Sequence, residues 1–225
     1  MKIMDGNKAC SNVAYLFSEV CSIYPITPSS PMAENIDYLT HTDKTNIFND
    51  KPVVNELESE LGAAGALHGA LISGSLGVSF TASQGLLLMI PNLYKIAGEC
   101  LPGVIHVAAR SLATHALSIF GDHQDIYAVR QTGFCMLAST NVYDAQNLAA
   151  VAHLSAIKGS LPFIHFFDGF RTSHELNTIK ELDEKKVLSL VDKEALEKFK
   201  KRSLVLDNKN VYGTSQTEDI YFQIT

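Results

Sequence analysis

The 225-residue chain has room for one large domain or two small ones, and its 46% hydrophobic and 19% charged residues exclude extended disorder over most of its length. The net charge of −6 argues against a surface dedicated to nucleic acid, which needs an excess of Lys and Arg. The N-terminus has no apolar signal-peptide region, and the most apolar run, residues 85–90, is too short to cross a bilayer. We therefore expect a cytoplasmic protein that binds neither nucleic acid nor membrane.

Residues 5–168 alternate between short β-like and longer helix-like segments. Helices are expected at residues 7–20 (with Asn7 as N-cap), 56–74, 84–98 (interrupted at Pro91) and 144–158. Strands are expected at residues 46–50, 52–55, 76–83, 103–110 and 162–168. Apolar strands alternating with helices predict an α/β fold, a doubly wound and mostly parallel sheet with helices on both faces.

Four polar sequence segments follow apolar stretches of the predicted sheet. They are YPITPSS (24–30), TASQG (81–85), ARSLATH (109–115) and FFDGFRTSH (166–174). In parallel sheets, ligands bind at the carboxyl ends of the strands. We therefore expect these four polar segments to meet at one edge of the sheet and to contribute to a ligand site.

The sequence changes character after about residue 177. Residues 178–202 are rich in charge but carry enough leucine and valine for one or two amphipathic helices, and the remaining residues are polar and loop-like. We divide the chain into an α/β domain at 1–177 and a charged helical extension with a C-terminal linker at 178–225. We expect this linker to continue into further domains.

The four cysteines, Cys10, Cys21, Cys100 and Cys135, are far apart and form no C-x-x-C pair. This spacing fits neither a zinc site nor an iron–sulfur cluster. We expect reduced thiols in the core, because a core of this size needs no disulfides.

Two ionisable residues stand in apolar surroundings. Glu60 has small, apolar neighbours one turn away, so it is either a proton partner for a ligand nitrogen or an ordinary helix-start glutamate. Arg110 ends an apolar strand, where a guanidinium can bind a carboxylate through two nitrogens; otherwise it pairs with a loop acid such as Asp122. The residues alone leave both alternatives open.

Other motifs are weaker. Ser83 lies between a strand and a helix, with Asp168 and His174 following in the order of a serine-hydrolase triad, but Thr81 stands where the nucleophile motif has glycine. We therefore expect a polar turn around this serine.

The glycines at 62, 65 and 69 recur at helical spacing, which favours close helix packing over a phosphate-binding loop. His123, Asp122 and Asp125 are nearly adjacent in the sequence, a spacing more typical of hydrogen bonding and capping than of a metal site. No metal site is predicted in this chain.

Long segments of the sequence resemble the N-terminal part of pyruvate:ferredoxin (flavodoxin) oxidoreductase. They are MDGNKACSNVAYLFSEV, YPITPSSPMAE, SELGAAGALHGAL, FTASQGLLLMIPNLYKIAGE, PGVIHVAARSLATHALSIFGDHQD and NLAAVAHLSAIKGSLPFIHFFDGFRTSHE. The resemblance implies a thiamine diphosphate-binding fold of the pyrimidine type, which holds the aminopyrimidine end of the cofactor.

The resemblance also assigns roles to individual residues. Glu60 is expected to face the pyrimidine ring nitrogen and share a proton with it, which prepares the cofactor for its attack on a 2-oxoacid. Thr27 and Arg110 are expected to bind the carboxyl group of pyruvate. Pro25 and Ile26, in the same loop as Thr27, are expected to contact the cofactor.

The reaction implied by the resemblance is oxidative decarboxylation of pyruvate with coenzyme A, giving acetyl-CoA, carbon dioxide and reduced ferredoxin or flavodoxin, in a homodimer. The diphosphate motif with its Mg²⁺-binding asparagines and the cysteine-rich segments of 4Fe-4S clusters do not appear in the sequence. We therefore expect Mg²⁺ and the clusters in other domains, and no turnover by this chain alone. The alternatives are an oxidoreductase for another 2-oxoacid and a truncated, non-catalytic binding module.

Overall fold

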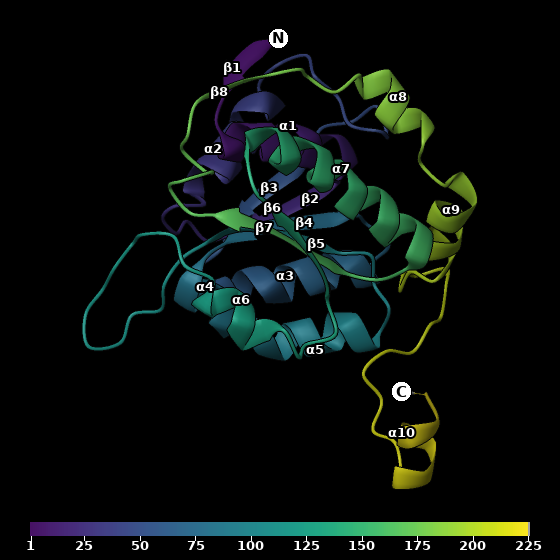
Figure 1. The fold of residues 1–225 in the computed structure, drawn as a ribbon. Helices are drawn as coiled ribbons and strands as arrows, with labels where there is room; N and C mark the ends of the chain where they lie inside the picture. Colours follow the sequence, from purple (N-terminus) through teal and green to yellow (C-terminus); the bar gives the residue numbers. More distant parts are fainter. Residues whose placement is uncertain (225) are drawn as a thin grey trace.

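A computed structural model describes residues 1–224, with a six-stranded parallel sheet between two layers of helices (Figure 1). The strand order is β3-β2-β4-β5-β7-β6. The strands are β2 (Val20–Ile23), β3 (Val53–Glu56), β4 (Gly77–Thr81), β5 (Val104–Ala109), β6 (Cys135–Ser139) and β7 (Phe163–Asp168). This architecture confirms the predicted doubly wound α/β fold.

Helices cover both faces of the sheet (Figure 1). One layer consists of α1 (Gly6–Phe17), α2 (Ser30–Thr40) and α7 (Val142–Gly159). The other consists of α3 (Glu60–Ile72), α4 (Ser83–Leu88), α5 (Ile90–Gly98) and α6 (Gln124–Val129). Strand β5 is buried along its whole length, as the continuous apolar run of its sequence predicted.

Side-chain caps and a proline fix the helix boundaries. Asp5, and not Asn7, is the N-cap of α1, because its carboxylate accepts a hydrogen bond from the Lys8 N–H at 2.8 Å. Ser59 caps α3 in the same way, through the Gly62 N–H at 3.1 Å. The predicted interruption at Pro91 is confirmed, since α4 ends at Leu88 and α5 begins at Ile90 with the proline in its first turn.

The predicted strand at residues 46–50 is wrong. These residues form a turn around Asn46, whose side-chain oxygen accepts the Phe48 N–H at 2.9 Å and whose amide donates to the Ser18 carbonyl at 2.7 Å. A buried asparagine that satisfies several backbone groups favours a turn over a strand. The predictions also omitted β2, whose first residue was assigned to the helix at 7–20, together with α2, α6, β6 and a short antiparallel pair formed by β1 (Lys2–Met4) and β8 (Asn177–Ile179).

The expected close packing of the α3 glycines does not occur within residues 1–224. Gly62, Gly65 and Gly69 lie on the exposed side of the helix, and a Cβ added at Gly65 or Gly69 would have no neighbour within 4 Å. The buried side of α3 carries Ala63, Leu67 and other apolar residues instead. The small residues therefore leave one side of α3 open within residues 1–224.

All four cysteines are free thiols within the described chain. Cys10 and Cys21 are buried, as predicted. Cys100 is exposed and Cys135 is half-buried, so the assignment of all four to the core is wrong. Cys100 follows the last turn of α5 with a φ of 51°, in a connection at the surface.

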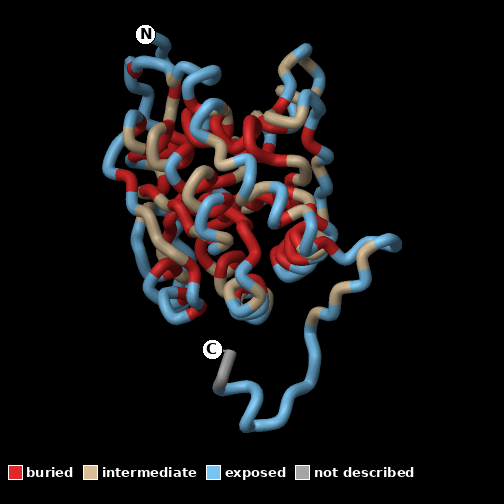
Figure 2. The backbone as a smooth tube through the Cα atoms, turned by 90° about the vertical axis from the view of Figure 1, so that its right-hand side faces the viewer, coloured by how far each residue is buried: buried red, intermediate tan, exposed pale blue. Residues whose placement is uncertain are grey.

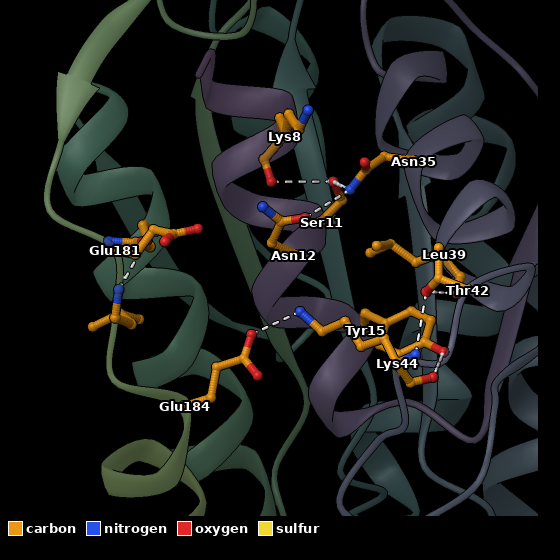
Figure 3. Close-up of polar contacts among 12 residues, drawn as sticks. Lys8, Ser11, Asn12, Tyr15, Asn35, Leu39, Thr42, Lys44, Glu181 and Glu184 are labelled. Carbon is orange, nitrogen blue, oxygen red and sulfur yellow. Dashed lines mark hydrogen bonds and ion pairs between the residues drawn. The ribbon is translucent and has the colours of Figure 1, made fainter. Parts of the chain in front are cut away.

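The segment after residue 177 packs against the α/β unit. Helices α8 (Glu184–Ser189) and α9 (Lys193–Lys201) are the amphipathic helices expected there, and their Val187 and Phe199 are buried in the main hydrophobic core. An ion pair of 2.7 Å between Lys44 and Glu184 joins this segment to the region around α1 and α2 (Figure 3). The boundary at 177/178 stays a proposal, and β8 straddles it.

The polar C-terminal residues lie largely outside the body of the molecule. The backbone is exposed along most of this stretch and leads away from the buried interior (Figure 2). A short helix, α10 (Glu218–Ile224), forms in the stretch expected to be loop-like. Within residues 1–224, no helix is both long enough and apolar enough to span a membrane.

Three buried histidines meet between β5, β7 and α7. The Nδ1 atoms of His106 and His165 are 2.9 Å apart, and the Nε2 atoms of His106 and His153 are 3.1 Å apart. Ser139 Oγ lies 2.7 Å from His165 Nε2. Burial lowers the pKa of each imidazole, to about 3 for His153 and His165, so all three rings are neutral at pH 7.

The protein is expected to lose stability as the pH falls below the ordinary histidine pKa of about 6.5, because the unfolded chain then binds protons that the folded chain excludes. The loss between pH 7.5 and 5 is about 2 kcal/mol for each imidazole whose folded pKa is near 3. Urea denaturation of His153→Gln should therefore show a shallower pH dependence. The exposed His115→Gln serves as the control, and equal slopes for both variants would contradict the prediction.

Candidate active site

The four polar segments at residues 24–30, 81–85, 109–115 and 166–174 meet at one edge of the sheet, as predicted. They follow β2, β4, β5 and β7, which are consecutive neighbours in the parallel sheet. The direction of winding reverses between β2 and β4, because the chain passes from β2 to β3 on one side and returns to β4 on the other. Ligand sites of open α/β sheets form at such a reversal, outside the carboxyl ends of the strands.

The loop after β2 is held from two sides. The Asn7 side-chain amide donates to the Pro28 carbonyl at 2.9 Å, and Arg110 Nη1 donates to the Thr27 carbonyl at 2.7 Å. The bond between Thr27 and Pro28 is a cis peptide. Pro25 and Thr27 are exposed and Ile26 is half-buried, so the loop is fixed through its backbone while these residues stay at least partly accessible.

Glu60 begins α3 at the same edge and is only 7% exposed. Within residues 1–224 its carboxylate makes no hydrogen bond or ion pair. A Cβ added at Gly85 would lie 2.7 Å from Glu60 Oε1 and 2.6 Å from Thr81 Oγ1, so the carboxylate rests against the α4 backbone next to this hydroxyl. The Thr81 hydroxyl is buried and also has no hydrogen-bond partner. A hydroxyl buried in this way is normally paired, which indicates a ligand or ordered water beside Thr81.

Arg110 follows β5 and is 7% exposed. Burial lowers the pKa of its guanidinium, while the nearby charges of Asp125 and Glu60 oppose this shift, and an arginine stays charged at neutral pH in any case. Its Nε has no hydrogen-bond partner. The alternative ion pair with Asp122 does not form among the described residues, so the guanidinium keeps donors for a ligand.

Asp125 connects the turns that carry these groups. Its carboxylate accepts backbone hydrogen bonds from Ser83 at 2.7 Å, Arg110 at 3.0 Å and Ile126 at 2.8 Å. Burial raises the pKa of this carboxyl, and the three hydrogen bonds oppose that shift. This role was missed in the sequence, where an aspartate beside His123 gives no sign that it reaches two strand ends.

The metal and triad alternatives lack the required geometry. Asp125 is committed to backbone N–H groups, and His123 Nε2 instead lies 3.8 Å from Asp168 Oδ1. Ser83 Oγ donates to the Ser111 carbonyl at 2.6 Å, and His174 Nδ1 contacts Ser173 Oγ at 2.7 Å, so no triad forms among the described residues.

One group of possible metal ligands within residues 1–224 lies in the core, away from the sheet edge, and consists of Cys10, His106 and His165. The 2.9 Å separation of the two Nδ1 atoms is that of an N–H···N hydrogen bond between neutral rings. The contact satisfies both nitrogens without an ion.

Comparisons with known proteins identify the family of the chain. The family described as pyruvate flavodoxin/ferredoxin oxidoreductase, thiamine diphosphate-binding, matches residues 12–225. A pyruvate-flavodoxin oxidoreductase of Klebsiella pneumoniae is 57% identical over 223 residues, covering 99% of this chain and 19% of the relative. A pyruvate:ferredoxin oxidoreductase of Moorella thermoacetica is 57% identical over 220 residues, covering 98% of this chain and 19% of the relative. The chain thus spans about a fifth of the length of these relatives.

A solved structure supports the fold. The 2-oxoglutarate:ferredoxin oxidoreductase from Magnetococcus marinus matches with a TM-score of 0.71 at 22% identity, over 82% of this chain and 32% of that one. The extent and identity of the sequence matches establish the family directly. The chain therefore belongs to the pyruvate flavodoxin/ferredoxin oxidoreductase family and matches its N-terminal thiamine diphosphate-binding domain.

Proposed function

We propose that the chain is the part of a pyruvate:ferredoxin or flavodoxin oxidoreductase that holds the aminopyrimidine of thiamine diphosphate and the carboxyl group of pyruvate. The observation that carries this proposal is the buried Glu60 carboxylate without an intramolecular partner, at the same sheet edge as Arg110. The reaction is oxidative decarboxylation of pyruvate with coenzyme A. Its products are acetyl-CoA, carbon dioxide and electrons that reduce ferredoxin or flavodoxin one at a time.

The residues at the sheet edge fit this cofactor. A buried carboxylate and an unpaired hydroxyl suit the nitrogen-rich edge of an aminopyrimidine, and the exposed Pro25 and half-buried Ile26 offer apolar contacts for its ring. Thiamine diphosphate supplies a nucleophilic carbon and a sink for the electrons released by decarboxylation. Glu60 would exchange a proton with the pyrimidine ring nitrogen, since its carboxylate has no partner of its own among the described residues.

The substrate carboxylate would bind between the loop after β2 and the end of β5. Arg110 is held in place by its hydrogen bond to the Thr27 carbonyl, which directs the guanidinium toward this loop. Its remaining N–H groups can bind a carboxylate through two hydrogen bonds. Thr27, whose carbonyl accepts this hydrogen bond, is exposed and would donate its side-chain hydroxyl to the same carboxylate.

The remaining components are assigned to other domains. We propose that these supply Mg²⁺ with the diphosphate site, the 4Fe-4S clusters and the sites for coenzyme A and ferredoxin or flavodoxin, in a cytoplasmic homodimer. Names of relatives support the pyruvate and ferredoxin or flavodoxin assignments, and the solved neighbour has coenzyme A bound. The isolated chain, carrying only the pyrimidine end of the site, is expected to be inactive.

The test is a comparison of 2-oxoacids with the full-length oxidoreductase of which we propose this chain to be a part. With coenzyme A and an electron acceptor present, kcat/KM should be highest for pyruvate and turnover should require thiamine diphosphate. A higher kcat/KM for a longer 2-oxoacid would favour the alternative substrate. Absence of thiamine-dependent turnover would favour a non-catalytic binding module.

A further inference from the structure

Gly85 is the third residue of α4 and lies in its first turn. It is buried, and its backbone is not in the left-handed region that favours glycine, so its conformation alone does not require glycine. A Cβ at this position would lie 2.7 Å from Glu60 Oε1, 2.8 Å from Glu60 Cγ and 2.6 Å from Thr81 Oγ1. All three separations are shorter than van der Waals contact permits.

The helix that carries Gly85 cannot easily move away. Its first residue, Ser83, donates its backbone N–H to Asp125 Oδ2 at 2.7 Å, and the same oxygen holds the Arg110 N–H. Leu86, the next residue after Gly85, is fully buried in the core. A side chain at position 85 would therefore displace the Glu60 carboxylate or the Thr81 hydroxyl and leave the helix in place.

Other crowded glycines in the chain face different neighbours. A Cβ at Gly77 would meet the side chain of Leu67, and one at Gly103 would meet that of Leu71. Those glycines make room for apolar core packing. Gly85 differs because the atoms it accommodates belong to the carboxylate that we assign to the cofactor.

We propose that Gly85 is a positioning residue for Glu60, because the missing side chain leaves the space in which the carboxylate can face the pyrimidine ring nitrogen. This inference rests on the proposed function of Glu60. Gly85 itself touches no reacting atom and acts only through the location of the carboxylate.

The experiment introduces Gly85→Ala into the full-length oxidoreductase and measures thiamine diphosphate binding by calorimetry and proton exchange at the thiazolium C2 by NMR. The dissociation constant should rise about tenfold, as expected for the loss of one hydrogen bond to a charged group. Proton exchange should slow by on the order of a hundredfold, since a displacement of about 1 Å has this effect on a catalytic group. Gly98→Ala, at the exposed end of α5 with no atom within 4 Å of the added Cβ, is the matched control and should change neither quantity.

A second substitution tests whether Gly85 acts through Glu60. Glu60→Ala removes Oε1 and Cγ, the two Glu60 atoms that the added methyl group would meet. Adding Gly85→Ala to the Glu60→Ala variant should therefore change neither thiamine diphosphate binding nor proton exchange further. If Gly85→Ala alone does not fold, the Gly85→Ala/Glu60→Ala double variant decides, and recovery of folding supports the inference. Restoration of the Gly85→Ala enzyme by Thr81→Ala would overturn it, since Gly85 would then serve the threonine.

The outcomes separate this inference from the proposed function. If Glu60→Gln impairs exchange and Gly85→Ala does not, the Gly85 inference is wrong and the role of Glu60 stands. If Glu60→Gln leaves both binding and exchange unchanged, the proposed function of Glu60 fails, and the Gly85 inference fails with it. If Gly85→Ala slows exchange by the same factor in the unmodified enzyme and in the Glu60→Gln variant, Gly85 acts independently of the carboxylate and the inference is overturned.

Discussion

Replacing Glu60 with glutamine in the full-length enzyme is expected to slow proton exchange at the thiazolium C2 of bound thiamine diphosphate by about 10²–10⁴-fold. Glutamine has nearly the same shape but cannot take up or release a proton. The surroundings of Glu60 offer no substitute, because no other carboxylate of the described chain contacts it. The measurement is the loss of the C2 proton signal in deuterated buffer, followed by NMR after an acid quench.

The fold should survive this substitution. Glu60 is a first-turn residue of α3, where the loss of a negative charge costs about 0.3–1 kcal/mol through the helix dipole. Glu58→Gln is the matched control, since this residue is exposed and lies two positions before Glu60. Equal exchange rates for the Glu60→Gln enzyme and the unmodified enzyme would refute the assignment of Glu60 as the proton partner.

The α/β sheet could be predicted in outline because β4 and β5 are fully buried and β5 and β7 are largely apolar runs, although β2 was missed. Strand β5 and the polar residues that follow it are an example: the run VIHVAA places Arg110 at the carboxyl edge without any knowledge of the remaining fold. Strand β6, CMLAS, was missed because it is only half-buried and short. Its identity as a strand comes from its pairing with β7, a tertiary contact that local pattern does not contain.

The site was predictable only in part, for a related reason. A charge next to an apolar run marks Arg110 and Glu60 as candidates, but their shared location depends on a strand order that the sequence does not state. The contact between Gly85 and Glu60 joins α4 to α3, and the Asp125 carboxylate joins α6 to the ends of β4 and β5. Such long-range contacts have no local signal, so they became visible only in the structure.

Arg110→Ala is expected to weaken pyruvate binding by about 2–5 kcal/mol, because it removes one partner of a desolvated charge pair. The change should appear mainly in KM or in a directly measured dissociation constant, while thiamine diphosphate binding stays close to normal. Arg110→Lys should give an intermediate loss, since an ammonium keeps the charge but cannot form two parallel hydrogen bonds to a carboxylate. Arg130→Ala, an exposed arginine at the end of α6, is the control.

A purely structural role for Arg110 must be separated from substrate binding, because its Nη1 also donates to the Thr27 carbonyl and the alanine variant loses this loop contact. Methyl pyruvate, which has no carboxylate charge, provides the distinction. If Arg110 binds the substrate carboxylate, the preference of the enzyme for pyruvate over methyl pyruvate should collapse in the Arg110→Ala variant. If the arginine only supports the loop, both substrates should be weakened by the same factor and the preference should persist, which would return Arg110 to a structural role.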